Sequence, residues 1–318
     1  VSGVLFALSF APVGLWPIAL LAAGPLVIAA EAVGRRRRGG IVRTALGAWV
    51  GSMPWWAYAM VWTARNTQLG YPPLILVLAV YAGVFVWAYA RTRRRFGVAP
   101  AAVLLPLLWA GVEVVRGEWG FDGYPWYLVA HPLIDGPAWW FTWPAAIAGA
   151  YIVSALAVLP LAGTVDWVAG RRRWALASWL LCGAWVAAGA AGVLAPTSTG
   201  SVRTALVQTN VPQDVRGSWD PAERWEQWQR LKSLTLEAAS AERRPEFVVW
   251  PETMFPGVAF EDAAAQAERD AGLAWFVERP GGGDALQIPA WLVRDQVLET
   301  QRAIGVPLVV GAASFEDF

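Results

Sequence analysis

The chain has 318 residues, of which 57% are hydrophobic and only 15% charged, and its mean hydropathy is +0.41. Soluble domains are typically about 45–50% apolar and about 25% charged, so a single water-soluble globule is excluded and part of the chain is expected to face lipid. The net charge of +1 argues against a nucleic-acid partner, because few phosphates could be neutralised. One cysteine and one histidine exclude a disulfide framework and a cysteine-rich metal site, and no metal or cofactor is expected.

The apolar residues are distributed unevenly along the chain. Residues 1–195 are almost entirely apolar apart from short arginine clusters, whereas residues 200–318 contain most of the Asp, Glu and Gln. A Pro/Ser/Thr/Gly stretch between Ala195 and Gly200 has the composition of a turn or linker. The sequence therefore predicts a transmembrane helical domain over 1–195 and a separate, water-soluble domain over 200–318.

Spanning helices need about 20 predominantly apolar residues. The stretches that satisfy this length are 15–33, 41–62, 72–90, 99–115, 144–169 and 174–194. The opening stretch, Val1–Phe10, is apolar for only half a span and has no basic segment before it, unlike a signal peptide. We expect it to be the outer end of a first helix that begins before Val1. The prediction is a polytopic α-helical membrane bundle of about six full spans plus this partial one.

Arginine placement predicts the orientation of the bundle. The arginines cluster after alternate spans, as Arg35–Arg38 with Arg43, Arg91 with Arg93–Arg95, and Arg171–Arg173. The positive-inside rule places all three clusters in the cytoplasm, where their expected role is to set topology rather than to bind nucleic acid or a particular lipid. We therefore expect a multi-pass protein of the cytoplasmic (inner) membrane, with the soluble domain on the extracytoplasmic, or periplasmic, side.

The outer loop over residues 116–143 mixes aromatic, glycine and charged residues. Two interpretations stay open: a platform for lipid headgroups at the membrane surface, or a re-entrant loop that packs against the helices. Glu113 and Arg116, three residues apart at a helix end, are expected to pair with each other. His131 is expected to be a packed loop residue rather than a ligand, and Cys182, in the middle of a span, an inert small hydrophobe.

The soluble half has the pattern of an α/β layer. Three short apolar runs, 202–207, 247–250 and 307–310, predict buried strands, and residues 221–242 and 291–304 predict amphipathic helices before the second and third of them. Strands that alternate with helices favour parallel pairing. The glycine-rich stretch 280–284 follows no predicted strand, so we interpret it as a turn rather than a phosphate site.

Glu252 directly follows the second predicted strand, in the sequence Trp250-Pro251-Glu252-Thr253. Sites in α/β proteins lie at the carboxyl edge of the sheet. A carboxylate there can be desolvated enough to act as a general base. By itself this signal is modest, because many strands end in a glutamate.

The order of several motifs along the chain resembles the apolipoprotein N-acyltransferase family, the integral membrane branch of the carbon–nitrogen hydrolase (nitrilase) superfamily. In the apolar half the matching stretches are Leu8–Pro12, Trp16-Pro17, Glu113 to Arg116-Gly117, Gly123–Trp126 and Ile134–Pro137. In the soluble half they are Val207–Gln213, Trp219-Asp220, Val249–Thr253 and Val309–Gly311. These stretches run along nearly the whole chain.

The resemblance implies a fold and a reaction. The soluble half is expected to be the amino-terminal part of a nitrilase-like (αββα-type) catalytic domain. The family moves an acyl chain from a phospholipid donor onto a cysteine, and then onto the amino group of a diacylglyceryl-cysteine at an apolipoprotein N-terminus. Glu252 falls on the family's general base. Trp219 matches a tryptophan of a loop near the lipid-entry side, and Trp250 and Thr253, beside Glu252, are further substrate-contact candidates.

The chain departs from the family in its catalytic set. The family's Lys and Cys lie downstream of the third strand, whereas the single lysine here is Lys232 and the single cysteine Cys182, and neither matches those positions. We therefore expect a chain truncated at both ends and inactive as it stands. The stretch 261–299 is longer than the family's connection and is expected to contain an extra helical loop.

Two alternatives to this interpretation remain. The chain can be a non-catalytic membrane protein that binds lipids or lipoproteins, or it can belong to another amide-processing branch of the same superfamily.

Overall fold

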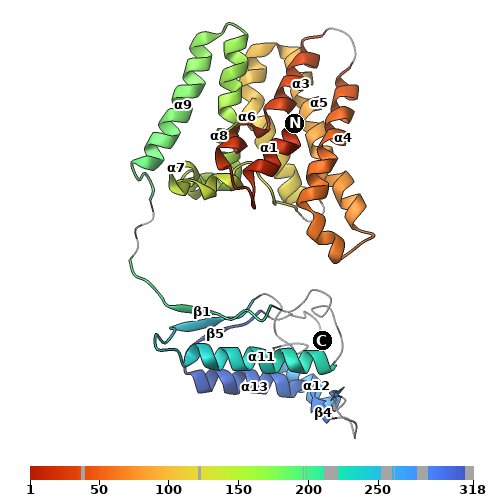
Figure 1. Cartoon of the computed structure of the whole chain (residues 1–318), viewed down its shortest axis with the longest axis vertical. Coiled ribbons are helices and arrows are strands. Elements are labelled where there is room, and N and C mark those ends of the chain that lie inside the picture. The colour runs from red at the N-terminus through yellow and green to blue at the C-terminus, as the bar shows by residue number, and fades with distance from the viewer. Residues whose placement is uncertain are drawn as a thin grey trace. The chain divides into compact units, whose positions relative to one another are not determined.

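The computed structural model describes residues 1–36, 40–120, 123–195, 197, 199–210, 221–251, 260, 262–277 and 286–311. By its internal contacts the chain divides into two compact units, Val1–Thr197 and Ser198–Phe318. The first consists of helices and turns, and the second contains a sheet with helices (Figure 1). Each unit is described here by itself.

The first unit, called the helical unit below, is built from long helices joined by short turns. Its elements are α1 (Ser2–Ser9), η1 (Trp16–Ile18), α2 (Ala19–Ala22), α3 (Gly24–Gly34), α4 (Ile41–Ala59), η2 (Val61–Arg65), α5 (Tyr71–Phe96), α6 (Val98–Val114), the π-turn η3 (Val115–Trp119), η4 (His131–Asp135), α7 (Ala138–Thr142), α8 (Ala145–Val168) and α9 (Arg172–Ala190). Helices are thus present in all the stretches that the sequence predicts as spans.

Four segments of this unit are long and apolar enough to cross a membrane: Trp16–Gly34, Tyr71–Phe96, Val98–Trp119 and Ala145–Val168. The helices α4 and α9 have 19 residues each, which at about 1.5 Å per residue approaches the roughly 30 Å of a hydrocarbon core. Their arginines, glycines and interfacial aromatic residues lower their mean hydropathy. The helical membrane part of the predicted fold is supported, and the count of six full spans stays a prediction.

Close helix–helix packing forms the core of the helical unit. The helix α5 packs against α3, α4 and α6, and α8 packs against α6 and α9. A side chain on Gly83 would come within 2.9 Å of the Ala45 carbonyl, and one on Gly163 within 2.5 Å of the Trp179 indole nitrogen. Small residues at such crossings are how apolar helices gain contact where the hydrophobic effect between helices is absent.

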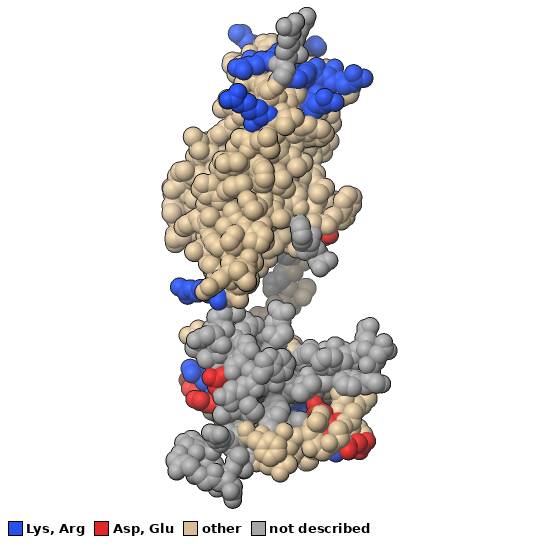
Figure 2. Space-filling model, turned by 90° about the vertical axis from the view of Figure 1, so that its right-hand side faces the viewer, with Lys and Arg blue, Asp and Glu red and all other residues tan. Residues whose placement is uncertain are grey.

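The three arginine clusters lie at one end of the helical unit. This is the end where α3, α5 and α8 finish and where α4 and α9 begin, and Figure 2 shows Lys and Arg gathered there. Because α9 runs from that end to the other, the chain leaves the helical unit at the end opposite the arginine clusters. The side of the membrane on which each end lies stays a prediction.

A three-stranded parallel sheet organises the second unit, called the sheet unit below. Its strands β1 (Thr204–Leu206), β2 (Phe247–Val249) and β5 (Leu308–Val309) lie in the order β1-β2-β5. The helix α11 (Pro221–Ala239) precedes β2, and α13 (Ala290–Ile304) precedes β5. The predicted strands, helices and parallel pairing are confirmed, with shorter strands than the apolar runs suggested.

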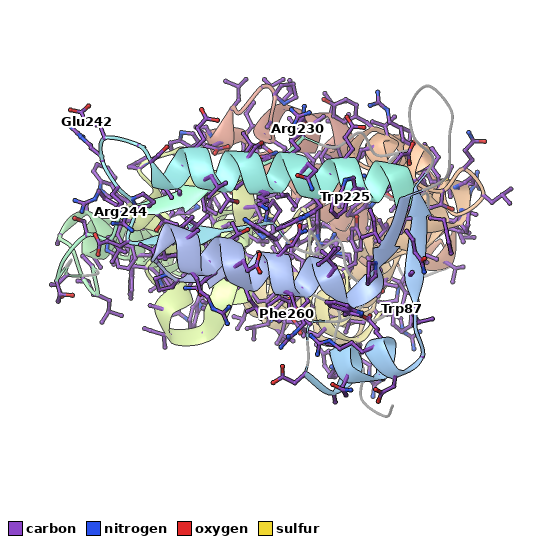
Figure 3. All side chains as sticks on the ribbon, turned by 90° about the horizontal axis from the view of Figure 1, so that it is seen from below. Trp87, Trp225, Arg230, Glu242, Arg244 and Phe260 are labelled. Atoms are coloured by element: carbon purple, nitrogen blue, oxygen red, sulfur yellow. The ribbon has the colours of Figure 1, made fainter. Side chains whose placement is uncertain are left out.

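Both helices cover the same face of the sheet. They lie side by side beneath it (Figures 1 and 3), and Trp228, Leu231, Val248, Val293 and Val297 form the core between the two layers.

On the opposite face of the sheet, Leu206, Val249 and Val309 are aligned across the three strands. Leu206 is 78% exposed and Val309 is 51% exposed. One face of the sheet is therefore apolar and uncovered within the described residues.

A small subdomain between β2 and α13 was only partly foreseen. It contains the helix α12 (Asp262–Asp270) and an antiparallel hairpin of β3 (Ala274–Val277) with β4 (Leu286–Pro289). The expected extra helix is present, but the hairpin was missed, because four apolar residues in a row do not show the alternation of a half-exposed strand. The glycine-rich stretch 280–284 lies outside the described residues.

Glu268 on α12 is a buried carboxylate, only 7% exposed, and its Oε1 has no hydrogen-bond partner among the described residues. Burial raises the pKa of this carboxyl group above its ordinary value, and the neighbouring Arg269 partly opposes the shift. The ionised form is therefore disfavoured in the folded state relative to the unfolded one. This cost to stability is fully present above the folded pKa and disappears as the pH falls below the unfolded pKa.

We predict that Glu268→Gln stabilises the sheet unit at pH 7 and that its advantage over the unchanged protein shrinks as the pH falls toward 4, the ordinary range of a carboxyl group. Hydrogen exchange of the α12 and α13 amides in the detergent-solubilised chain measures the effect. Glu237→Gln, at an exposed position of α11, is the matched control and should leave exchange unchanged. An equal effect of both substitutions would contradict the assignment.

Candidate functional site

The sequence predicts a catalytic glutamate, Glu252, at the carboxyl edge of the parallel sheet. The strand β2 is central in the sheet and continues into Trp250 and Pro251, the last described residues before Glu252. Glu252, Thr253 and Trp219 lie outside the described residues, so their predicted roles stay predictions. The structure describes the chain on either side of the segment that carries Glu252, Trp250 and Pro251 before it and Phe260 after it, which we call the frame of Glu252.

Trp250, on the N-terminal side of Glu252, is anchored in the core. Its ring is 2% exposed and packs against Trp228 with ring centroids 5.9 Å apart. The Trp250 indole N–H donates to Thr235 Oγ1 at 2.9 Å, and the Trp228 indole N–H donates to Gln296 Oε1 at 2.7 Å. The ring of Trp250 is thus fixed in the core beneath the sheet, and its predicted contact with substrate remains a prediction.

The neighbouring strands meet Trp250 at this edge. The backbone N–H of Trp250 donates to the Val309 carbonyl at 2.9 Å, and that of Val207 donates to the Val249 carbonyl at 3.0 Å. Just past β1, Thr209 is buried and Asn210 takes a left-handed backbone conformation with φ of 52°, which asparagine tolerates better than most residues. The ends of β1 and β5 therefore flank the end of β2 on both sides at this edge.

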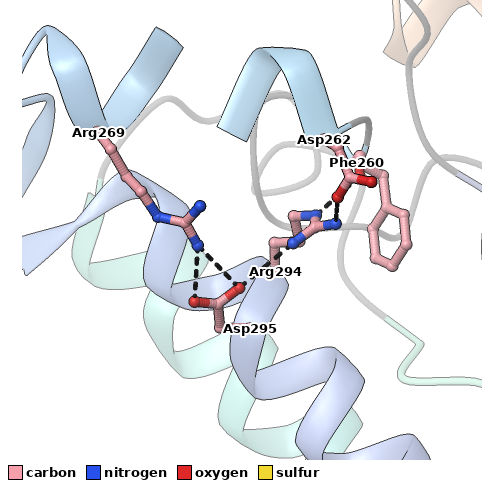
Figure 4. A network of polar contacts seen from close by, with 5 residues as sticks. All are labelled: Phe260, Asp262, Arg269, Arg294 and Asp295. Carbon is pink, nitrogen blue, oxygen red and sulfur yellow. Dashed lines mark hydrogen bonds and ion pairs between the residues drawn. The ribbon is translucent and has the colours of Figure 1, made fainter. Parts of the chain in front are cut away.

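Arg294 binds the chain at Phe260, the first described residue after Glu252 (Figure 4). Its Nε donates to the Phe260 carbonyl at 2.9 Å, and its guanidinium pairs with the Asp262 carboxylate and, at 3.4 Å, with Asp295. Asp295 also accepts from Arg269 at 3.0 Å. The segment that carries Glu252 thus has both of its ends fixed, by Trp250 on one side and by Arg294 on the other.

The residues that brace this frame were not singled out in the sequence. Thr235, Gln296 and Arg294 are polar residues on the helices α11 and α13, and helix positions of this kind usually face solvent. A polar residue on the inward side of an otherwise amphipathic helix is the one signal that could have indicated them.

Lys232 and Cys182 belong to different units of the chain. Lys232 lies on α11 in the sheet unit, and Cys182 lies on α9 in the helical unit. Among the residues that the structure describes, no group of three or more His, Cys, Asp or Glu side chains could hold a metal ion. The expectation that neither residue belongs to a catalytic set stays a prediction.

At the end of the helical unit opposite the three arginine clusters, Glu113 and Arg116 bind the outer loop. The Glu113 carboxylate accepts from the Trp109 indole at 3.1 Å and from the backbone N–H of Val129 at 2.9 Å. Arg116 donates to the Trp126 carbonyl at 2.8 Å and lies over the Trp56 ring at 5.1 Å. Both side chains are almost completely buried.

Glu113 and Arg116 attract each other electrostatically, but they do not form the direct pair that the sequence predicts, because each binds loop backbone. The physical reason is the π-turn from Val115 to Trp119, which interrupts the helical register at that point, so a spacing of three no longer brings the side chains together.

Of the two interpretations that the sequence left open for the outer loop, the contacts support packing against the helices, and the headgroup platform stays a prediction. Leu128, Val129 and Leu133 are fully buried, and the Tyr127 hydroxyl donates to the Ala59 carbonyl at 3.0 Å, so this part packs against the helices. Trp119 and Trp126 are exposed, as interfacial aromatic residues are.

A cavity of about 310 Å³ adjoins Arg116, and its walls include Trp55, Phe85 and Trp109. It is a largely apolar space whose lining also includes the charged residues Glu113 and Arg116.

His131 begins the short helix η4 within the packed loop. Burial lowers the pKa of its imidazole, and the nearby Arg116 lowers it further. Since the ordinary histidine pKa is about 6.5, the ring is neutral at pH 7. The prediction that His131 is a packed loop residue agrees with its partial burial.

Comparison with known proteins gives these features a family context. Residues 2–163 match the family model described as the apolipoprotein N-acyltransferase N-terminal domain. The chain is 28% identical over 297 residues to an apolipoprotein N-acyltransferase of Vibrio parahaemolyticus, covering 86% of this chain and 55% of that protein. It is 30% identical over 268 residues to the enzyme of that name from Pseudomonas putida, covering 78% of this chain and 50% of that protein.

The chain therefore spans about half the length of the curated relatives that it matches. The family model alone covers half of the chain, including the helices from α1 to α6, the outer loop and most of α8. On this evidence, the chain belongs to the apolipoprotein N-acyltransferase family.

Proposed function

We propose that the chain provides the membrane part and the glutamate-bearing part of an enzyme that N-acylates the diacylglyceryl-cysteine of apolipoproteins. Family membership carries the proposal. The structural support is the central strand β2 of the parallel sheet, whose carboxyl end at Trp250-Pro251 directly precedes Glu252 in the sequence.

The proposed reaction has two acyl transfers. A cysteine thiol loses its proton to Glu252 and attacks the ester carbonyl of a phospholipid; the C–S bond forms, the C–O bond breaks, and the lysophospholipid alcohol leaves with the proton. The α-amino group of the diacylglyceryl-cysteine then attacks the thioester, forming an amide and releasing the thiol. A lysine stabilises the negative charge on the carbonyl oxygen in both steps.

Of these groups, the chain contributes Glu252. In the family's pattern the lysine and cysteine follow the third strand, and neither Lys232 nor Cys182 has that position. We propose that Trp219 and Thr253 contact substrate near Glu252. Trp250 and Arg294 position the segment that carries the glutamate, since each fixes one of its ends.

The sheet unit is proposed to be part of a nitrilase-like αββα sandwich. Its helices cover one face of the sheet, and the apolar row of Leu206, Val249 and Val309 lies on the other. A second sheet packed against this row would complete such a sandwich and remove an exposed apolar face.

The proposed location is the cytoplasmic (inner) membrane. The arginine clusters lie at one end of the helical unit, which the positive-inside rule assigns to the cytoplasm. The chain leaves α9 at the opposite end, so the sheet unit belongs on the extracytoplasmic side. The apolar cavity beside Arg116 then lies at the outer half of the bilayer, where a phospholipid donor has its ester groups.

A second candidate function is non-catalytic binding of lipids or lipoproteins. The observation that favours it is the cavity of about 310 Å³ beside Arg116, which offers room for an acyl chain whether or not acyl transfer follows. Capture of an alkyne-labelled acyl chain from phosphatidylethanolamine by a chain extended through the family's lysine and cysteine motifs distinguishes the two functions, because only the enzyme forms a hydroxylamine-sensitive thioester.

We predict that the purified 318-residue chain forms no such thioester, because its single cysteine, Cys182, lies on the apolar helix α9 and matches no catalytic position of the family. Gel fluorescence after coupling the alkyne to a dye measures this, with Cys182→Ser as the control for non-specific label. A hydroxylamine-sensitive signal that Cys182→Ser removes would overturn the interpretation.

In a chain extended through the family's lysine and cysteine motifs, we predict that Glu252→Gln slows thioester formation about 10²- to 10⁴-fold, the usual contribution of a general base. Arg294→Gln should slow it by a smaller factor that Arg294→Lys partly restores, since lysine keeps the charge but loses the fork that binds both Phe260 and Asp262. Equal thioester rates for Glu252→Gln and the unchanged protein would contradict the role of Glu252.

Arg116→Met should destabilise the outer loop, because the Trp126 carbonyl loses its donor and the buried Glu113 loses its nearest cation. An unsatisfied buried group costs on the order of 1–3 kcal/mol. Limited proteolysis of residues 116–136 in detergent reports the change. Arg65→Met, at an exposed arginine of η2, is the matched control, and equal protection of the loop in both variants would refute the assignment.

A further inference from the structure

A groove between α3 and α8 runs along the arginine end of the helical unit. The helix α3 packs against α5, and α8 packs against α6 and α9, which leaves a groove of about 290 Å³ between α3 and α8. Val27 and Val165 are buried at its floor, whereas Ile28 is 70% exposed and Val168 is 67% exposed at its sides. The groove is therefore apolar and open to the surroundings of the unit.

The polar end of this groove is formed by Glu31 and Arg35. The Glu31 carboxylate accepts from the Tyr89 hydroxyl at 2.8 Å, from Arg93 Nε at 3.1 Å and from Arg35 Nε at 3.1 Å. Two guanidinium groups therefore face one carboxylate, and the local charge is positive. The side chain of Arg35 stays 50% exposed while its Nε is fixed by Glu31, so the rest of its guanidinium is held at the mouth of the groove.

The length of the groove matches one leaflet of a bilayer. Its lining on α3 extends from Gly24 to Arg35, which corresponds to roughly 16 Å at 1.5 Å per residue. The hydrocarbon core is about 30 Å thick, so one leaflet contributes about 15 Å. An acyl chain that lies along Ile28 and Val168 would place its headgroup at the level of Arg35.

The positive charge at the arginine end favours an anionic lipid as the occupant of the groove. The described residues here include ten arginines and two buried carboxylates, Glu31 and Asp166; the arginines are Arg35, Arg36, Arg43, Arg91, Arg93, Arg94, Arg95, Arg171, Arg172 and Arg173. Basic groups beside an apolar groove at the membrane surface attract anionic headgroups. A zwitterionic headgroup carries a positive group of its own, which these arginines would repel.

We propose that the groove between α3 and α8 is a binding site for one anionic phospholipid of the leaflet at the arginine end, with its phosphate at Arg35 and an acyl chain along Ile28 and Val168. The site is separate from the acyl transfer, which is proposed for the sheet unit, and from the cavity beside Arg116 at the opposite end of the helical unit. A failure of one proposal therefore leaves the other unaffected.

Native mass spectrometry of the 318-residue chain tests the site, after incubation with equimolar phosphatidylglycerol and phosphatidylcholine of identical acyl chains. We expect one phosphatidylglycerol to be retained in preference to phosphatidylcholine. Arg35→Gln should reduce that preference about fivefold, the factor that corresponds to about 1 kcal/mol. Arg36→Gln removes the same charge one residue away, at a position that does not line the groove, and should keep the preference.

Ala32→Trp tests the groove itself, because Ala32 is exposed and lines it, so the indole should displace the acyl chain and abolish retention. Ala177→Trp, at an exposed position of α9, is the control for the added indole, and circular dichroism confirms that both variants are helical. Three results would overturn the proposal: no lipid retained, equal retention of the two lipids, or equal losses from Arg35→Gln and Arg36→Gln. The last would reduce the effect to the general positive charge of that end.

Discussion

Hydrocarbon cannot form hydrogen bonds, so every polar group in the helical unit needs a partner from the protein or a place at the membrane surface. Glu31 accepts from Tyr89, Arg93 and Arg35 at the arginine end. At the other end, Glu113 and Arg116 bind the backbone of the outer loop. The constraint that makes the helices apolar thus confines charged residues to the helix ends. There they bind the loops, and they lie beside the apolar groove at Arg35 and the cavity at Arg116.

The sheet unit follows a different rule, because water is available on its outside. Its apolar residues gather between the sheet and the helices α11 and α13, and two tryptophans of that core, Trp228 and Trp250, have their N–H groups satisfied by Gln296 and Thr235. Buried indoles that are both packed and hydrogen-bonded have little freedom to move. The strand end that leads to Glu252 is therefore a rigid starting point, as a catalytic group needs.

Family membership and the structure support the proposed enzyme through different parts of the chain. The matched family region covers most of the helical unit, whereas the proposed general base belongs to the sheet unit. The relatives are about twice as long as this chain. The apolar face of the sheet along Leu206, Val249 and Val309 is the feature that the proposed sandwich explains and that a sheet unit standing alone would leave exposed to water.

The sequence by itself determined the division into apolar helices and a parallel α/β layer, because hydrophobic runs and their periods reflect local geometry. It also placed Glu252 after the central strand and the arginines at alternate helix ends. Only the tertiary structure decided the partners of Glu113 and Arg116, since a π-turn changed their register. The bracing by Arg294 and the groove at Arg35 likewise depend on segments far apart in the sequence, whose contacts no local pattern encodes.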